Sequence, residues 1–196
     1  SVGADGDVPC RPVAQLDRAD DVSRPARVFL LGMMGSGKTA VGQALARRLG
    51  WRYRDNDQQL QIAVGAAVDE VAESSGRGRL HELEVEQAAF AAAEPPPVVA
   101  GLAASVVENK QLWATLRAAG WCVYLRARPD TLVGRVGTGA GRPWLASNQA
   151  GFVQRTLQRR GPLYTALADV MIDVDELGPS QIAAAAVELL RLESRV

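Results

Sequence analysis

The sequence predicts an α/β protein in which helices cover both faces of a parallel sheet. From Arg27 onward, short apolar runs alternate with longer helical patterns in this chain of 196 residues. Such alternation implies right-handed crossover connections, which place helices on both sides of the sheet. The apolar runs are also nearly continuous, as in strands that are buried on both faces.

The first elements can be justified one by one. Residues 27–31 form a β-prone apolar run that Gly32 ends, and this pattern predicts a buried strand. Apolar side chains then recur at helical spacing until Gly50, which predicts a helix that stops there. A brief second strand is expected at residues 51–54, directly before Asp55-Asn56-Asp57.

Helical patterns dominate the next part of the chain. The expected helices cover residues 58–64, 67–74 and 80–93. In the last of them, Leu83, Ala88 and Phe90 are expected to face the core. Three consecutive prolines at residues 95–97 end this helix, because proline cannot continue one, and a third strand is expected at residues 98–100.

The remaining chain repeats the alternation. Its expected elements are a helix at 109–118, a strand at 121–125, a helix at 129–136, a Gly-rich stretch through Gly141, a helix at 151–160, a strand at 170–172 and a closing helix at 179–192. Residues 26–196 are therefore expected to form one domain. Residues 1–25 carry scattered Gly, Pro, Asp and Arg without an apolar period, and are expected to be a disordered tail. Residues 12–19 look like translated tRNA-gene sequence, which leaves open whether this tail belongs to the natural protein.

Composition excludes several classes of protein. The 22 basic and 22 acidic side chains give no net charge, which disfavours a general nucleic-acid binder. No apolar run approaches the roughly 20 residues that span a bilayer, so no membrane partner is expected. The first residues lack the pattern of a signal peptide, and Cys10 and Cys122 lack metal-ligand spacing, which together predict a cytoplasmic protein. Only Lys38 and Lys110 are lysines among the basic residues.

The main chemical motif follows the first strand. Residues 32–39 read Gly-Met-Met-Gly-Ser-Gly-Lys-Thr and fit the phosphate-loop pattern. Its glycines allow backbone N–H groups to turn toward a polyphosphate, and the following helix adds its positive dipole end. Lys38 can reach the β and γ phosphates, and the Thr39 hydroxyl can bind Mg²⁺. A simple Gly-rich turn is the alternative, but the pattern arises by chance in roughly one such chain per thousand.

The residues around this loop resemble the shikimate kinase family of small P-loop kinases. The similarity extends over residues 28–190 and rests on the loop itself, on Leu49-Gly50-Trp51 leading to Asp55-Asn56-Asp57, on Gly141-Arg142-Pro143-Trp144-Leu145, and on Arg160-Gly161-Pro162-Leu163-Tyr164. The resemblance implies a three-layer P-loop kinase fold with a five-stranded parallel sheet and a lid at about residues 137–150. It also implies transfer of the γ-phosphate of ATP, with Mg²⁺, to a hydroxyl of a small molecule such as shikimate.

The resemblance assigns roles around the nucleotide. The expected ATP-binding residues are Gly35, Ser36, Gly37, Lys38, Thr39, Ala40 and Arg135. Arg135 would stack on adenine, and Arg142 would close over the phosphates as a catalytic lid arginine. For both arginines, an ordinary surface charge is the alternative. Asp55 would support hydrated Mg²⁺ together with Thr39.

The resemblance also assigns residues to the acceptor. Asp57 would bind acceptor hydroxyls and take up or orient the proton of the attacking one, while Arg160 would pair with a carboxylate of the acceptor. For Asp55 and Asp57 the alternative is helix N-capping, and for Arg160 it is a charge at the C-terminus of a helix.

Two departures from the family concern the acceptor. His81 stands where the family has a carboxylate-binding arginine, although Glu84 three residues later persists. A histidine on a helix is also often an ordinary packing residue, and Arg77 or Arg79 could compensate for the missing charge. The triple glycine of the family is best matched by Ala100-Gly101-Leu102, whose side chains are expected to restrict close approach of a substrate.

These departures leave the acceptor open. The first reading is a kinase for shikimate, or for another polyol, sugar acid or cyclitol. The others are a non-catalytic nucleotide-binding protein and a nucleoside or nucleotide kinase. A monomer is favoured, but the sequence does not decide the oligomeric state.

Overall fold

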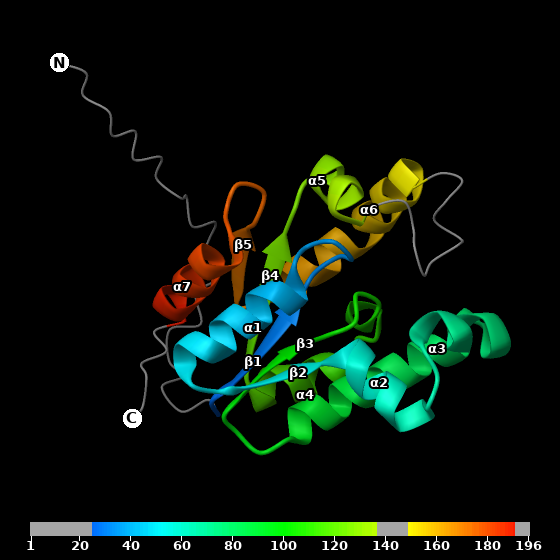
Figure 1. The fold of residues 1–196 in the computed structure, drawn as a ribbon, viewed down its shortest axis with the longest axis horizontal. Coiled ribbons are helices and arrows are strands. Elements are labelled where there is room, and N and C mark those ends of the chain that lie inside the picture. The colour runs from blue at the N-terminus through cyan, green and yellow to red at the C-terminus, as the bar shows by residue number, and fades with distance from the viewer. Residues whose placement is uncertain (1–24, 137–148, 191–196) are drawn as a thin grey trace.

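Five parallel strands form one sheet with the order β2-β3-β1-β4-β5 (Figure 1). The computed structural model describes residues 25–136 and 149–190. The strands are β1 (Arg27–Leu31), β2 (Arg52–Asp55), β3 (Val98–Gly101), β4 (Trp121–Arg126) and β5 (Val170–Asp173). The helices are α1 (Lys38–Leu49), α2 (Asn56–Val64), α3 (Val68–Ala93), α4 (Leu112–Ala119), α5 (Pro129–Val136), α6 (Gln149–Leu167) and α7 (Pro179–Leu189), with a short 3₁₀ helix η1 (Val106–Glu108). The predicted five-stranded α/β fold is confirmed.

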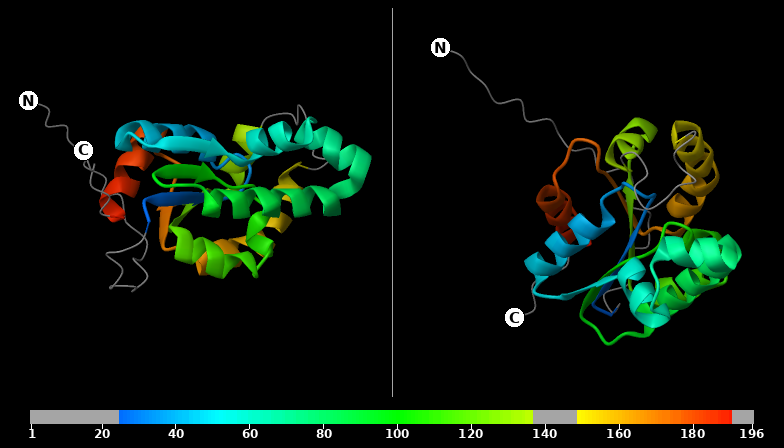
Figure 2. Two further views of the ribbon diagram at one scale, coloured as in Figure 1. Left: turned by 90° about the horizontal axis from the view of Figure 1, so that it is seen from below. Right: turned by 45° about the vertical axis from the view of Figure 1, so that its right-hand side comes forward.

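Helices pack on both faces of the sheet. Helices α1 and α7 pack together on one face, while α3, α4 and α6 cover the other (Figures 1 and 2). The central strand β1 is buried on both sides, with Phe29 and Leu30 fully inaccessible. Within the described residues, none of the helices combines the length and apolar character that crossing a membrane requires.

The long helical segment α3 contains a break at the expected place. Gly76 has φ 80° and ψ 163°, so the segment consists of two helical stretches, as its sequence predicts. The prediction that Phe90 faces the core is wrong, because 60% of this residue is exposed. The buried face at this end of α3 is made by small side chains, Ala88, Ala91 and Ala92, and Phe90 lies away from that face.

Helix α6 is longer than the sequence predicts. It continues through Pro162 to Leu167 rather than ending near Arg160. The buried Tyr164 holds the second half in place, because its hydroxyl donates to the carbonyl of Ala104 at 2.6 Å and its ring stacks on Tyr124 with centroids 4.8 Å apart. These contacts compensate for the hydrogen bond that proline removes from a helix.

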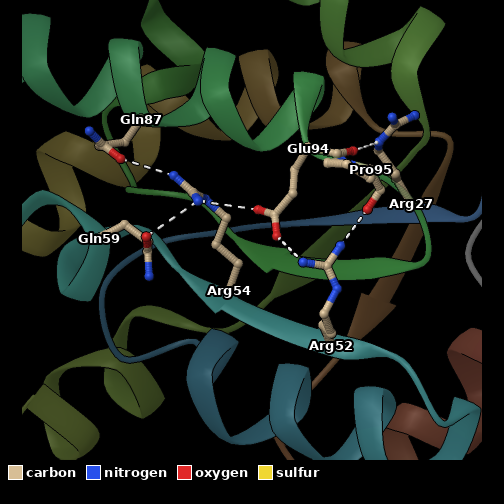
Figure 3. A network of polar contacts seen from close by, with 7 residues as sticks. All are labelled: Arg27, Arg52, Arg54, Gln59, Gln87, Glu94 and Pro95. Carbon is tan, nitrogen blue, oxygen red and sulfur yellow. Dashed lines mark hydrogen bonds and ion pairs between the residues drawn. The ribbon is translucent and has the colours of Figure 1, made fainter. Parts of the chain in front are cut away.

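The edge strand β2 presents different side chains to its two faces. Tyr53 and Asp55 point toward the first turns of α1, as their contacts with Gly42 and Thr39 show. Arg52 and Arg54 point to the opposite face, where both pair with the Glu94 carboxylate at the end of α3, at 2.6 and 3.2 Å (Figure 3). In the same network, Gln87 and Gln59 accept from Arg54, and Arg27 donates to the Glu94 carbonyl at 2.7 Å (Figure 3). The network anchors β2 beside β3.

Candidate active site

The carboxyl ends of β1, β2 and β3 open onto one cleft of about 640 Å³. Ligands collect at this end of the strands in open α/β sheets. The cleft is lined by the loop after β1, by residues 55–57 at the end of β2 and by residues 101–105 at the end of β3, and α3, α5 and α6 contribute further side chains. Nearly all predicted site residues that the structure describes therefore lie around one space.

Two glycines of the loop after β1 are required by its shape. Gly32 has φ +148°, and a methyl group there would lie 2.7 Å from the Ser36 hydroxyl and 2.8 Å from the Leu125 carbonyl. Gly35 has φ +83°, and a methyl group would lie 2.8 Å from Val136. The buried Ser36 hydroxyl has no hydrogen-bond partner among the described residues. The loop thus has the tight backbone that a phosphate cradle needs.

The first turn of α1 is arranged to receive an anion. Gly37 is its N-cap in the left-handed region, with no side-chain cap, and no acidic residue occupies the first turn. The amides and the positive dipole end therefore remain available. The Lys38 ammonium donates to the carbonyls of Gly32 at 2.9 Å and Met33 at 3.1 Å, so it lies over the loop. Ala40 also lines the cleft.

Asp55 joins three segments of the site. Its Oδ2 accepts from the Thr39 hydroxyl and from the Tyr53 hydroxyl, each at 2.9 Å. Its Oδ1 accepts from the backbone N–H groups of Asp57 at 3.1 Å and Gln58 at 3.4 Å, so Asp55 is also the N-cap of α2. Asp55 therefore caps helix α2, which was the alternative to a site role. The same carboxylate also lies beside Thr39 through its other oxygen, so the cap does not exclude that role. Burial and the nearby Asp55 carboxylate raise the pKa of the Tyr53 phenol above its ordinary range.

The residues at this position fit Mg²⁺ rather than a metal held entirely by protein. The described residues contain no group of three or more His, Cys, Asp or Glu arranged around a metal site. Mg²⁺ keeps several waters and is commonly bound through one or two oxygen ligands plus substrate phosphates. The Thr39 hydroxyl and the Asp55 carboxylate, next to the phosphate-binding loop, match that requirement.

Asp57 lies on the acceptor side of this pair. It stands in the first turn of α2, half-buried, and lines the cleft. Asp55 rather than Asp57 caps the helix, and Asp57 lines the cleft from the first turn after the cap.

His81 is part of a hydrogen-bonded cluster on the cleft wall. Its Nδ1 lies 2.9 Å from the hydroxyl of Ser105, and that hydroxyl donates in turn to the Glu84 carboxylate. Because the only proton of Ser105 goes to Glu84, His81 must donate from Nδ1 to the serine oxygen. His81 therefore lines the cleft as predicted, with an imidazole ring where the family has a guanidinium.

Arginines gather at the far end of the cleft. Arg160 lines it, and its Nε donates to Glu108 Oε1 at 2.8 Å, while Arg159 reaches the same oxygen at 2.8 Å. Because α6 continues past Arg160, the alternative of a charge at a helix C-terminus is wrong. Of the two possible substitutes for the missing charge at His81, Arg77 lines the cleft, whereas Arg79 pairs with Glu82 and Glu86 on the surface.

The strand end after β3 differs from the sequence-based expectation. Gly101 lines the cleft, and a methyl group there would meet the Tyr53 hydroxyl at 2.8 Å. Ala100 does not line the cleft and is 1% exposed within the core, so its methyl group does not restrict a substrate. Leu102 is equally buried but does line the cleft, and the expected restriction therefore concerns Leu102 alone.

Of the two arginines that were predicted to contact the nucleotide, the structure describes Arg135 but not Arg142. Arg135 lines the cleft from α5, and its guanidinium donates to the Val174 carbonyl at 2.9 Å. The lid arginine Arg142 and most of the expected lid fall on residues 137–148, outside the residues that the structure describes.

Sequence reasoning missed three residues of the site: Tyr53, Ser105 and Glu108. Tyr53 lies two positions before Asp55 on the same strand, so strand alternation could have placed both on one face. Ser105 and Glu108 come close to His81 and Arg160 only through the fold, and no local pattern marks them.

Comparison with known proteins is consistent across sequence and structure. The family model for shikimate kinase matches residues 34–191. A shikimate kinase of Moorella thermoacetica is 34% identical over 167 residues, covering 85% of this chain and 95% of that protein. A shikimate kinase of Salinispora arenicola is 37% identical over 161 residues, covering 82% and 95%. The solved structure of a shikimate kinase from Acinetobacter baumannii in complex with shikimate has a TM-score of 0.81, at 25% identity over 86% of this chain and 94% of that one.

Proposed function

The chain belongs to the shikimate kinase family, and we propose that it transfers the γ-phosphate of ATP to a hydroxyl group of shikimate. Membership makes the protein an ATP-dependent phosphotransferase that acts on an alcohol group of a small molecule and uses Mg²⁺. The observation that carries the choice of acceptor is a single cleft that joins the phosphate-binding loop to Asp57, Gly101 and Arg160.

In the nucleotide half of this proposal, the loop amides and Lys38 bind the phosphates. The Lys38 ammonium has three N–H donors, and two of them already point at loop carbonyls around the phosphate position. Arg135 lies against adenine, and Arg142, outside the described residues, closes over the transferring group. Further phosphate-binding contacts come from Gly35, Gly37, Thr39 and Ala40, which line the cleft, and from Ser36 within the same loop.

In the acceptor half, Asp57 accepts the hydrogen bond of the attacking hydroxyl and orients its oxygen for in-line attack. Arg160 pairs with the carboxylate of shikimate, and Glu108 already fixes the Nε side of that guanidinium. His81 donates or accepts a further hydrogen bond, and Gly101 lines the cleft on the acceptor side.

The metal belongs beside the nucleotide. Thr39 and Asp55 would hold Mg²⁺, which when bound neutralises negative charge on the phosphates. The residues of the chain have a separate task, which is to keep reacting groups aligned and to exclude water that would hydrolyse ATP.

One observation favours a second acceptor class. His81 lacks the permanent charge and the fork geometry of a guanidinium, so the wall that it shares with Ser105 suits a hydroxyl better than a carboxylate. A polyol or cyclitol kinase is therefore the second candidate.

We also propose an oligomeric state, a compartment and a range of partners for the enzyme. It acts as a monomer in the cytoplasm, where ATP is available, and has no nucleic-acid partner. The buried Cys122 is not part of a disulfide within the described residues, which agrees with a reducing compartment.

A coupled ADP-release assay tests the acceptor. Purified protein with Mg²⁺ and ATP is given shikimate, gluconate, inositols or common sugars, each against a no-acceptor blank. Shikimate-dependent ADP release supports the proposal. A response to an inositol but none to shikimate would replace it with the second candidate.

A further inference from the structure

We propose that Tyr53 is a positioning residue for the metal site: its hydroxyl holds Asp55 in the orientation that turns a lone pair of Thr39 toward the cation. This inference rests on the proposed function, because it takes Thr39 and Asp55 as the metal-binding pair. Nothing in the phosphate-loop motif identifies Tyr53, which lies on β2 rather than in the loop.

The hydroxyl hydrogen of Thr39 is directed to Asp55. Its hydroxyl has one proton, and that proton points to Asp55 Oδ2 at 2.9 Å. Only the lone pairs of Thr39 Oγ1 then remain to face the cleft. A hydroxyl that donates to a carboxylate in this way presents an oxygen ligand to a cation, so the direction of Asp55 decides how Thr39 can bind a metal.

Hydrogen bonds fix both oxygens of the Asp55 carboxylate. Its Oδ1 is held by two backbone N–H groups of α2, and its Oδ2 is held by Tyr53 at 2.9 Å in addition to Thr39. Both oxygens are thus fixed, and rotation of the carboxylate breaks at least one hydrogen bond. Without the Tyr53 hydroxyl, Oδ2 has only Thr39 itself as a partner among these contacts.

Close packing against two glycines fixes the Tyr53 side chain. A methyl group at Gly42 of α1 would lie 2.2 Å from its ring carbon Cε2, and one at Gly101 of β3 would lie 2.8 Å from its hydroxyl. The Tyr53 side chain therefore packs between α1 and the end of β3, and residues 42 and 101 leave room for it only because both are glycines. The hydroxyl is a donor whose position the backbone sets, as a positioning residue requires.

Substitution Tyr53→Phe tests the inference, because it removes the oxygen and keeps the ring. ATP binding by the full chain is measured by calorimetry in EDTA and again across a series of Mg²⁺ concentrations. We expect ATP affinity in EDTA to stay within about twofold of wild type, while the Mg²⁺ concentration needed for half of the metal effect rises about tenfold, as for other residues that orient metal ligands. Tyr124→Phe is the control, since Tyr124 is also a phenol on a strand, although more deeply buried than Tyr53, and lies outside the cleft lining.

A double-variant measurement separates positioning from packing. If Tyr53 acts through Asp55, then Tyr53→Phe has no further effect on Mg²⁺ dependence in an Asp55→Asn background. Equal losses of ATP affinity with and without Mg²⁺, or an unchanged Mg²⁺ dependence, would overturn the inference. A wild-type protein whose ATP binding ignores Mg²⁺ would instead overturn the metal assignment of the proposed function.

Discussion

Arg160 and Glu108 are joined at 2.8 Å across the end of the cleft, between α6 and the short helix η1. Arg159 reaches the same carboxylate oxygen, so one acidic group neutralises part of the charge of two arginines. The contact with Glu108 uses Nε of Arg160, so the other N–H groups of its guanidinium are not used in this hydrogen bond. The pair therefore gives the acceptor end a fixed, directional cation.

The first prediction concerns stability against pH for Glu108→Gln. Burial alone would raise the pKa of Glu108, but the hydrogen bond and charge of Arg160, with Arg159, outweigh it and lower that pKa below the ordinary 4.5. A lowered pKa stabilises the folded state above the unfolded value, and the benefit disappears as pH falls through the folded value. We expect the variant to be less stable by about 1 kcal/mol at neutral pH, since the pair is partly exposed.

Urea denaturation at several pH values measures this difference. The free-energy curves of wild type and variant should converge as pH falls below 4.5. Glu176→Gln is the control, because the Glu176 side chain is 82% exposed and its nearest cation, on Arg128, is 4.0 Å away. A gap for Glu108→Gln that persists at the lowest pH would contradict the ionic explanation.

The second prediction uses the two lysines of the chain. Lys38→Ala should lower the turnover number by about 100- to 1,000-fold or more, because it removes a preorganised cation from the phosphate position. Lys110→Ala should leave turnover unchanged, since Lys110 is exposed and lies 6.0 Å from the Trp113 ring. ADP release measures both. Substantial activity in Lys38→Ala would refute the assignment of the phosphate loop.

The third prediction separates catalysis from binding at Asp57. Asp57→Asn should lower the turnover number by about 100- to 10,000-fold, as for loss of a residue that handles a proton, with little change in ATP affinity. Asp69→Asn is matched to it, because Asp69 is also half-buried in the first turn of a helix but lies outside the cleft lining. Equal losses of turnover and ATP affinity would assign Asp57 to nucleotide binding or folding.

The fourth prediction concerns the contact between Gly42 and Tyr53. Gly42→Ala places a methyl group 2.2 Å from the ring and should destabilise the fold by about 1–3 kcal/mol, although alanine favours a helix. Gly134→Ala, in open space on α5, should be neutral or stabilising by up to about 1 kcal/mol. Thermal and urea unfolding measure both.

A double variant tests the cause of that loss. In Gly42→Ala with Tyr53→Leu, the smaller side chain relieves the overlap, so the loss should be less than the sum of the single losses. Additive losses would mean that the methyl group acts elsewhere.

Local patterns account for the arrangement of the residues that follow β1 and β2. The loop of residues 32–39 is contiguous in sequence, and its glycines, Lys38 and Thr39 lie where the motif requires. Asp55 and Asp57 follow a short strand, so their place at the end of β2 could also be predicted. These features depend on neighbours within a few residues, which a sequence displays directly.

Long-range contacts explain what could not be predicted. Glu108 and Arg160 are 52 residues apart, and Ser105 and His81 are 24 apart, so neither pair has a local signature. The helix expected at residues 151–160 continues through Pro162 to Leu167, because the buried Tyr164 holds its second half in place. Phe90 was placed in the core for its hydrophobicity, whereas small alanines form the buried face there.

The alternation of β2 makes its alignment with β3 critical. A shift of one residue would exchange the two faces of the strand, bringing Arg54 toward Thr39 and turning Asp55 toward Glu94. That exchange would place a cation beside a cation site and a carboxylate beside another carboxylate. The ion pairs of Arg52 and Arg54 with Glu94 therefore favour the correct strand alignment, so contacts on one face of β2 keep Asp55 beside Thr39 on the other.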